Sequence, residues 1–109
     1  MDQDAAIGAL SALAHPGRLE VFRLLVRAGP EGLAAGEIAR ATQILPNTLS
    51  TNLNILAGAG LVASRREGRS VIYTAAYDRM RQLLGFLMED CCAGKPEICA
   101  DLGASGCAS

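Results

Sequence analysis

The four cysteines of this 109-residue chain stand together near its carboxyl end, at Cys91, Cys92, Cys99 and Cys107. Cys91 and Cys92 are poorly placed to form a disulfide with each other, because adjacent Cα atoms lie only ~3.8 Å apart. As thiolates, they are well placed to bind one soft ion together. The cluster therefore indicates a metal site or a redox switch, and cysteines that serve only as small apolar residues are the third interpretation.

Redox sensing and zinc binding fit this cluster less well. A redox sensor needs thiols that ionise readily, whereas the adjacent pair follows the end of an expected helix, where the dipole disfavours anions, and adjoins Glu89 and Asp90. Zinc sites commonly pair cysteines that are separated by two to four residues, although Cys107 could complete a four-cysteine set. A soft ion can still displace the thiol protons when it binds.

A second group of side chains could contact nucleic acid. The run from Pro46 to Ala59 predicts a helix whose leucines face the core and whose other side carries hydroxyl and amide groups. Such groups can hydrogen-bond base edges in DNA, and asparagine is suited to adenine. Arginines near Gly68, in an expected hairpin, could reach phosphates or the minor groove. The candidate DNA contacts are Asn47, Thr48, Ser50, Thr51, Asn52, Asn54, Arg65, Arg66 and Arg69. A solvated helix face beside a charged turn is the alternative interpretation.

The elements that would position these groups follow from hydrophobic periodicity and from turn residues. We expect helices over 5–14, 16–28, 34–42, 46–59 and 77–90, a turn at 29–32, and a hairpin over 61–75. Pro16 and Pro46 are well placed to begin helices, and Gly60 to close one.

Apolar stripes predict one face on each main helix. These faces consist of Ile7, Leu10, Leu13 and Ala14; of Leu19, Phe22, Leu25 and Val26; and of Leu49, Leu53 and Leu56. The last helix carries a stripe wider than a small core needs, made of Met80, Leu83, Leu84, Leu87 and Met88. We therefore expect part of that stripe to form a subunit interface.

Helix, tight turn, helix and basic hairpin is the order of a winged helix-turn-helix, a fold that is mainly α with a β-hairpin wing. The net charge of −1 is unlike that of a typical nucleic-acid-binding protein. However, residues 40–81 carry a net charge of +4, and the segments on either side of them are acidic. An anionic partner should therefore meet the middle of the chain.

Other protein classes find little support in the sequence. It has no Ser/His/Asp set, no phosphate-binding loop and no redox Cys-x-x-Cys, so we do not expect an enzyme. No apolar run approaches the ~18–20 residues of a membrane span, and the acidic start Met1-Asp2-Gln3-Asp4 is unlike a secretory signal. We expect a cytoplasmic protein with no membrane partner. A metal-buffering protein that binds no DNA is a further alternative.

Three stretches of the chain resemble one protein family. The run 15–25 (HPGRLEVFRLL) is similar to the second-helix signature of the ArsR/SmtB metalloregulatory repressors. The run 46–62 (PNTLSTNLNILAGAGLV) resembles their recognition helix and its exit, and 65–69 (RREGR) with Tyr73 resembles their wing. The resemblance implies a homodimeric repressor that leaves its operator when it binds a thiophilic metal or metalloid.

Two metal sites that are common in this family are absent from the sequence: a Cys-x-Cys on the helix before the recognition helix, and a zinc site of histidines and carboxylates on the last helix. Residues 37–42 contain no cysteine, and the only histidine, His15, is more typical of a helix boundary than of a ligand. The remaining candidate is the tail, in which flexible or turn-forming residues between 92 and 99 could bring Cys99 to the ion held by the adjacent pair. Three thiolates suit trivalent arsenic or antimony, and this tail resembles the C-terminal Cys-Cys and third Cys of an arsenic-responsive subset of the family.

We therefore predict a winged helix-turn-helix domain over 1–90 and a metalloid-binding tail over 91–109, with As(III) or Sb(III) held by Cys91, Cys92 and Cys99. The expected protein is an arsenite- or antimonite-responsive repressor that binds double-stranded operator DNA as a homodimer. An ArsR-type repressor that responds to thiol oxidation, to sulfide or to Zn, Cd or Pb is the alternative.

Overall fold

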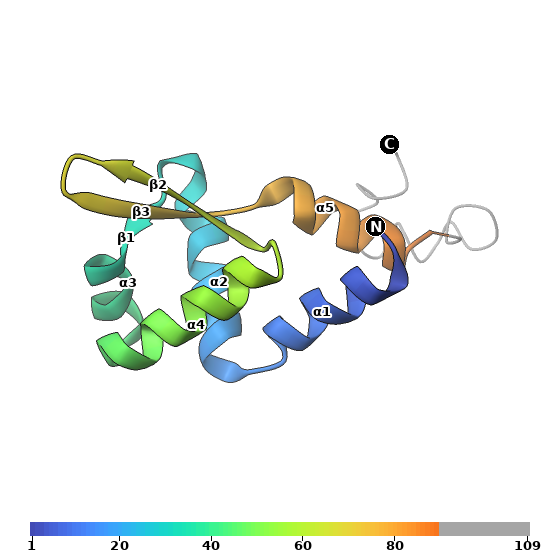
Figure 1. Ribbon diagram of the computed structural model, residues 1–109, viewed down its shortest axis with the longest axis horizontal. Coiled ribbons are helices and arrows are strands. Elements are labelled where there is room, and N and C mark those ends of the chain that lie inside the picture. Colours follow the sequence, from blue (N-terminus) through green and yellow to red (C-terminus); the bar gives the residue numbers. More distant parts are fainter. Residues whose placement is uncertain (90–109) are drawn as a thin grey trace.

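The computed structural model describes residues 1–89, and its helices and hairpin follow the predicted order. The elements are α1 (Gln3–Leu13), α2 (Pro16–Ala28), the 3-10 turn η1 (Gly29–Glu31), β1 (Leu33–Ala34), α3 (Ala35–Thr42), α4 (Pro46–Gly58), β2 (Val62–Glu67), β3 (Ser70–Ala75) and α5 (Tyr77–Leu87). The β2–β3 hairpin lies at one end of the molecule, and α1 and α5 lie at the other (Figure 1). The fold is a winged helix-turn-helix, as predicted. The last helix ends at Leu87, three residues before its predicted end at Asp90, which itself lies outside the described residues.

Proline begins two of the helices that pack in the centre of the molecule. Pro16 is the first residue of α2, where a helix makes no use of an N–H. The Nδ1 atom of His15 caps this helix by accepting hydrogen bonds from the N–H groups of Gly17 and Arg18, at 3.1 and 3.3 Å. α4 also begins at a proline, but its N-cap residue, Leu45, has no side-chain acceptor for the first-turn N–H groups.

The wing is a tight antiparallel hairpin. Its register pairs Val62 with Ala75 at the base and Glu67 with Ser70 at the tip. Gly68 has a φ of +62°, a backbone conformation that suits glycine in a two-residue hairpin turn. The predicted turn at Gly68 is therefore confirmed.

A short third strand, β1, was not predicted, because two residues show no periodicity. Leu33 and Ala34 pair with Tyr73 and Ile72 of β3. Gly32 comes directly before this strand with a φ of +70°, and a Cβ atom there would collide with the carbonyl oxygen of Tyr73. Glycine thus permits the close approach that adds β1 to the edge of the wing.

Small residues form the face of α1 that packs on the core. Ala6, Ala9 and Ala12 are buried, whereas Ile7 and Leu10 are exposed. The predicted apolar face of Ile7 and Leu10 is therefore not the packed face of this helix. Alanine allows the α1 backbone to lie close to α2 and α4, with which it makes contacts.

Larger apolar side chains of α2 and α4 pack in the same core as these alanines. In α4 the predicted face of Leu49, Leu53 and Leu56 is buried, so this prediction is confirmed. In α2 the buried face is centred on Val21 and Leu25, which are one helical turn apart. The expectation that Leu19 shares this face is wrong, because its position on the helix turns the side chain toward solvent.

Candidate nucleic-acid interface

The outward side of α4 presents the neutral polar side chains that were predicted to contact bases. Its exposed polar residues are Asn47, Thr48, Ser50, Thr51 and Asn54. The Thr51 hydroxyl donates to the carbonyl oxygen of Asn47 at 3.2 Å, which leaves the hydroxyl oxygen free to accept. No residue from Pro46 to Gly58 carries a charge. Any contact from this helix to DNA therefore has to be a neutral hydrogen bond or an apolar contact.

Asn52 does not belong to this exposed side, and its prediction as an outward residue is wrong. Its side chain is only 3% exposed, and the Nδ2 atom has no hydrogen-bond partner in the described structure. Position 52 follows Leu49 by three residues and precedes Leu56 by four, so it lies on the buried face. The amide lies against Gly17 of α2, where a Cβ atom would come within 3.1 Å of Nδ2.

Arg65 is also placed differently from the prediction. Its guanidinium forms an ion pair with Glu67 through Nε at 2.6 Å. The two terminal nitrogens donate to the carbonyl oxygens of Pro30 and Glu31, at 3.1 and 2.8 Å. The Arg65 side chain therefore holds the wing against η1. It is not held out toward a phosphate, as we had expected of a residue at the hairpin tip.

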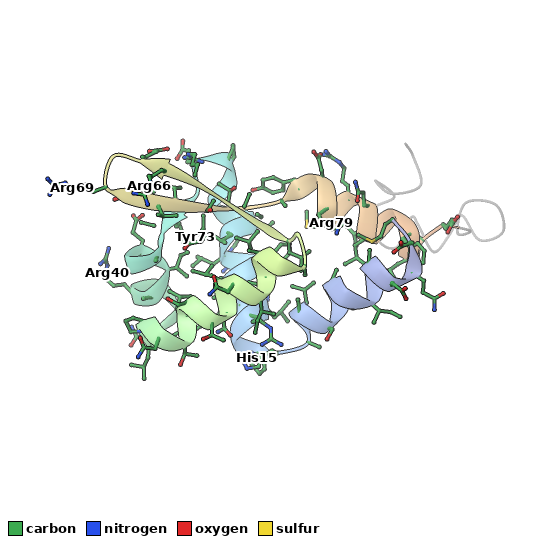
Figure 2. The ribbon with its side chains drawn as sticks, viewed as in Figure 1. His15, Arg40, Arg66, Arg69, Tyr73 and Arg79 are labelled. Carbon is green, nitrogen blue, oxygen red and sulfur yellow. The ribbon has the colours of Figure 1, made fainter. Side chains whose placement is uncertain are left out.

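Arg66 and Arg69 remain available at the wing. Both side chains are exposed, and neither side chain forms a hydrogen bond or an ion pair with any other residue of the described segment. Figure 2 shows both at the far end of the molecule, where the hairpin tip lies. Their guanidinium groups can therefore approach phosphates without breaking an existing contact.

Arg40 was not among the predicted contacts, although it contributes to the positive charge of the middle segment. It is exposed in the last turn of α3 and extends toward the same end of the long axis as Arg69 (Figure 2). In helix-turn-helix proteins the first helix of the pair crosses the DNA backbone. The signal that could have found Arg40 is its place three residues before the tight connection between the two helices.

Two contacts attach α5 to α2 and to the end of α4. The Tyr77 hydroxyl donates to the carbonyl oxygen of Val26 in α2 at 3.0 Å. Arg79 lies over the end of α4, where its Nε donates to the carbonyl oxygen of Ala59 at 3.3 Å. Gly60 makes room for it, since a Cβ atom there would come within 2.8 Å of the same nitrogen. A positive side chain at this helix end is also favourable for the helix dipole.

The described residues contain no candidate metal site. Across residues 1–89, no three His, Cys, Asp or Glu side chains are grouped closely enough to hold a metal ion. His15 caps α2, which agrees with its prediction as a helix-boundary residue. The predicted ligands Cys91, Cys92 and Cys99, and also Cys107, lie outside the described residues.

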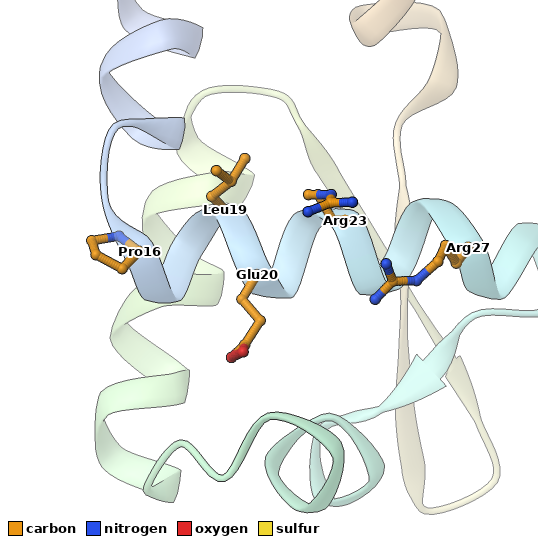
Figure 3. Close-up of a pocket in the computed structure, with 5 residues that line it drawn as sticks. All are labelled: Pro16, Leu19, Glu20, Arg23 and Arg27. Atoms are coloured by element: carbon orange, nitrogen blue, oxygen red, sulfur yellow. The ribbon is translucent and has the colours of Figure 1, made fainter.

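A shallow hollow runs along the solvent side of α2 (Figure 3). It is lined by Pro16, Leu19, Glu20, Arg23 and Arg27, all of which belong to that one helix. The hollow is therefore an open strip of surface rather than an enclosed site.

Within the described segment, no helix is long and apolar enough to span a membrane.

Comparison with known proteins identifies the family. A family model described as a helix-turn-helix domain matches residues 13–65. The nodulation protein NolR of Rhizobium meliloti is 33% identical over 88 residues, which cover 81% of this chain and 70% of that protein. A solved structure from Mycobacterium bovis is also similar: it is the homodimeric winged helix-turn-helix DNA-binding domain of a possible ArsR-family transcriptional regulator. The two chains are 32% identical, the match covers 80% of this chain and 81% of the M. bovis chain, and the TM-score is 0.65. The chain belongs to the ArsR family. It is therefore a DNA-binding transcriptional regulator and not an enzyme, as predicted.

The ArsR-family relatives have names that point to several biological roles. The biofilm growth-associated repressor of Agrobacterium fabrum is 34% identical over 82% of this chain and 74% of its own length. A putative arsenical resistance operon repressor of Halobacterium salinarum is 36% identical over 61% of this chain and 50% of its own. Membership of the ArsR family thus fixes the fold and the class of regulator, whereas the names of the relatives point to no single inducer.

Proposed function

We propose that the chain is a homodimeric repressor that binds operator DNA through α4 and the wing, and that leaves it when As(III) or Sb(III) binds Cys91, Cys92 and Cys99. The observation that carries the DNA-binding part is the exposed, uncharged polar side of α4 together with the exposed Arg66 and Arg69 on the wing. The sulfur cluster in residues 91–109 carries the choice of inducer.

The DNA contacts divide into two kinds. The neutral groups Asn47, Thr48, Ser50, Thr51 and Asn54 would hydrogen-bond base edges in the major groove. Arg66, Arg69 and Arg40 would bind phosphates, which supply most of the affinity but little sequence information. Asn52 and Arg65 are left out of this contact set, because the first is buried and the second is bonded to η1.

A second copy of the chain is the partner that fits the exposed apolar surface of α1 and α5. Ile7 and Leu10 are exposed on α1, and Leu84 and Leu87 are exposed on α5, which contacts α1. We call these four residues the α1–α5 face. Large exposed apolar side chains on two helices that contact each other are typical of a subunit interface. Two-fold pairing would present two α4 helices to half-sites about one DNA turn apart.

The tail would act as the sensor because three thiolates complete the preferred surroundings of a trivalent metalloid. Arsenous acid and three thiols give one As atom bound to three sulfurs, and three water molecules leave. Soft cations favour thiolate ligands for the same reason. The relative from Halobacterium salinarum, which is named as a putative arsenical resistance repressor, supports this choice of inducer.

The link from inducer to DNA would pass through α5. This helix leads directly into the tail, and it is bonded to α2 through Tyr77 and to the end of α4 through Arg79. A shift of α5 on metalloid binding would therefore change the spacing of the two α4 helices in the dimer. Allosteric coupling is typically ~1–3 kcal/mol, which is roughly 5–150-fold in operator affinity. By linkage, bound DNA would weaken metalloid binding by the same factor.

The proposal is tested by titrating arsenite into the reduced full chain bound to a fluorescent duplex. A suitable duplex is one selected by the chain from a random library. We expect the affinity for DNA to fall by roughly 5–150-fold. Cys91→Ser, Cys92→Ser and Cys99→Ser should each abolish this fall and keep the affinity measured without arsenite. Cys107→Ser is the matched control and should respond like the unmodified chain.

Each part of the proposal can fail separately. If the chain selects no duplex, DNA reading by α4 is wrong. If it binds DNA but ignores arsenite and antimonite, the inducer is wrong. Release by Zn, Cd or Pb, or release that coincides with tail disulfides or polysulfide bridges in a mass spectrum, would then favour the corresponding alternative. If Cys99→Ser still responds normally, the three-thiolate site is wrong.

A further inference from the structure

The side chain that opens α4 has no structural role within the described residues. Leu45 is 74% exposed, the largest fraction among the exposed large hydrophobic residues of residues 1–89. Its neighbour Ile44 is partly buried and packs against the core, so the connection between α3 and α4 is already anchored without Leu45. An aliphatic side chain this exposed gains almost nothing from burial.

Leu45 is also a poor choice for the stability of the helix. It occupies the N-cap of α4, where serine, threonine, aspartate or asparagine would accept a hydrogen bond from a first-turn N–H. The caps of α1 and α2 do provide such an acceptor, through Asp2 and His15. The N-caps of α3 and α5 are alanines without a side-chain cap, so what sets Leu45 apart is a large apolar side chain that is exposed at such a position. A residue that neither packs nor caps, at the exposed start of this helix, suggests a role in contacting a ligand.

The surroundings of Leu45 define what that ligand group must be. In helix-turn-helix proteins, the residues at the start of the recognition helix contact base edges in the major groove. α4 has no charged side chain, so its readout depends on neutral hydrogen bonds and apolar contacts. The 5-methyl group of thymine is the only methyl group that the four DNA bases display in the major groove. Leu45 is followed at once by the exposed Pro46, Asn47 and Thr48, so the apolar tip adjoins the hydrogen-bonding side.

We propose that Leu45 is a specificity-determining residue that contacts the 5-methyl group of a thymine in each operator half-site. This inference rests on the proposed reading of DNA by α4. Burial of one methyl group against an aliphatic side chain corresponds to about a threefold to fivefold gain in affinity per half-site. Leu45 would thus distinguish T·A from the other base pairs at a position where α4 offers no charge.

The test uses duplexes that the full chain selects from a random library. Each thymine is replaced in turn by deoxyuridine, which keeps every hydrogen-bonding group and lacks only the methyl group. We expect one thymine per half-site at which this replacement weakens binding about threefold to fivefold. Leu45→Ser should bind the thymine and deoxyuridine duplexes equally. Its melting temperature should equal or exceed that of the unmodified chain, because serine caps the helix.

Ile55→Ala is the matched control, since Ile55 is an exposed aliphatic residue on the same helix but far from its start. It should keep the sensitivity to deoxyuridine. The proposal is overturned if no thymine is sensitive, if Leu45→Ser keeps the sensitivity, or if Leu45→Ser melts lower and loses affinity equally for both duplexes. Failure to select any duplex would remove the role of α4 itself, whereas selected duplexes without a sensitive thymine refute Leu45 alone.

Discussion

His15 is the only histidine of the chain, and at the scale of single residues its task is to begin a helix. Its Nδ1 accepts from two N–H groups at the start of α2. A side-chain cap of this kind contributes about 0.5–2 kcal/mol. We expect His15→Ala to lower the free energy of unfolding by about 1 kcal/mol, measured by urea denaturation.

The matched variant is His15→Asn, because asparagine is among the best N-cap residues. It should recover most of the lost stability. Neither variant should change the response to arsenite, since His15 is assigned no part in binding it. A folded His15→Ala protein that binds DNA but no longer responds to the metalloid would instead make His15 a ligand.

At the scale of elements, the wing is held in place by one arginine and presents two others. Arg65 bonds to the carbonyl oxygens of Pro30 and Glu31, while Arg66 and Arg69 are uncommitted. We expect Arg66→Gln and Arg69→Gln to reduce the slope of log affinity against log salt concentration by about 0.9 for each phosphate contact removed. Fluorescence anisotropy over a series of salt concentrations measures this slope.

Arg65→Gln should behave differently, because this side chain orients the wing and does not contact phosphate. Its salt slope should stay near that of the unmodified chain, while hydrogen exchange at the hairpin should become faster. The Arg65 side chain is 44% exposed, so its ion pair with Glu67 adds little to stability. A slope change equal to that of Arg66→Gln would show that Arg65 binds phosphate after all.

At the scale of the whole molecule, the α1–α5 face should hold two copies together. Leu84 and Leu87 are 50% and 52% exposed. A charge at either position would therefore leave the protomer folded but would have to be desolvated in a dimer. We expect Leu84→Asp and Leu87→Asp to shift the protein to monomers in sedimentation velocity and to weaken DNA binding at least tenfold, since a monomer engages one half-site.

Leu19→Asp is the control for this experiment, because Leu19 is an exposed leucine of α2 outside the α1–α5 face. It should remain dimeric. If Leu84→Asp and Leu87→Asp stay dimeric as well, the partner copy binds elsewhere on the surface.

The sequence was informative where one periodic pattern decided the answer. The leucines of α4 fall at helical spacing, and Gly68 marks the hairpin turn, so both were predicted correctly. It was less informative where the same residues were compatible with either of two buried faces. α1 has small residues on one side and large ones on the other, and only packing shows that the alanines face inward.

In the candidate site, too, some features could be predicted from local sequence and others could not. An asparagine among polar neighbours suggested an exposed side chain, although the spacing of position 52 from Leu49 and Leu56 could have indicated burial. The bonds of Arg65 reach a turn 35 residues earlier in the chain, and no local pattern announces them. The exposure of Leu45 likewise depends on how α3 and α4 meet.

The α1–α5 face and the wing lie at opposite ends of the protomer (Figure 1). In a two-fold assembly that pairs through α1 and α5, a rotation of one protomer by a few degrees about these helices would displace its hairpin by ångströms. An inducer that acts on α5 would then need no contact with α4 or with the wing.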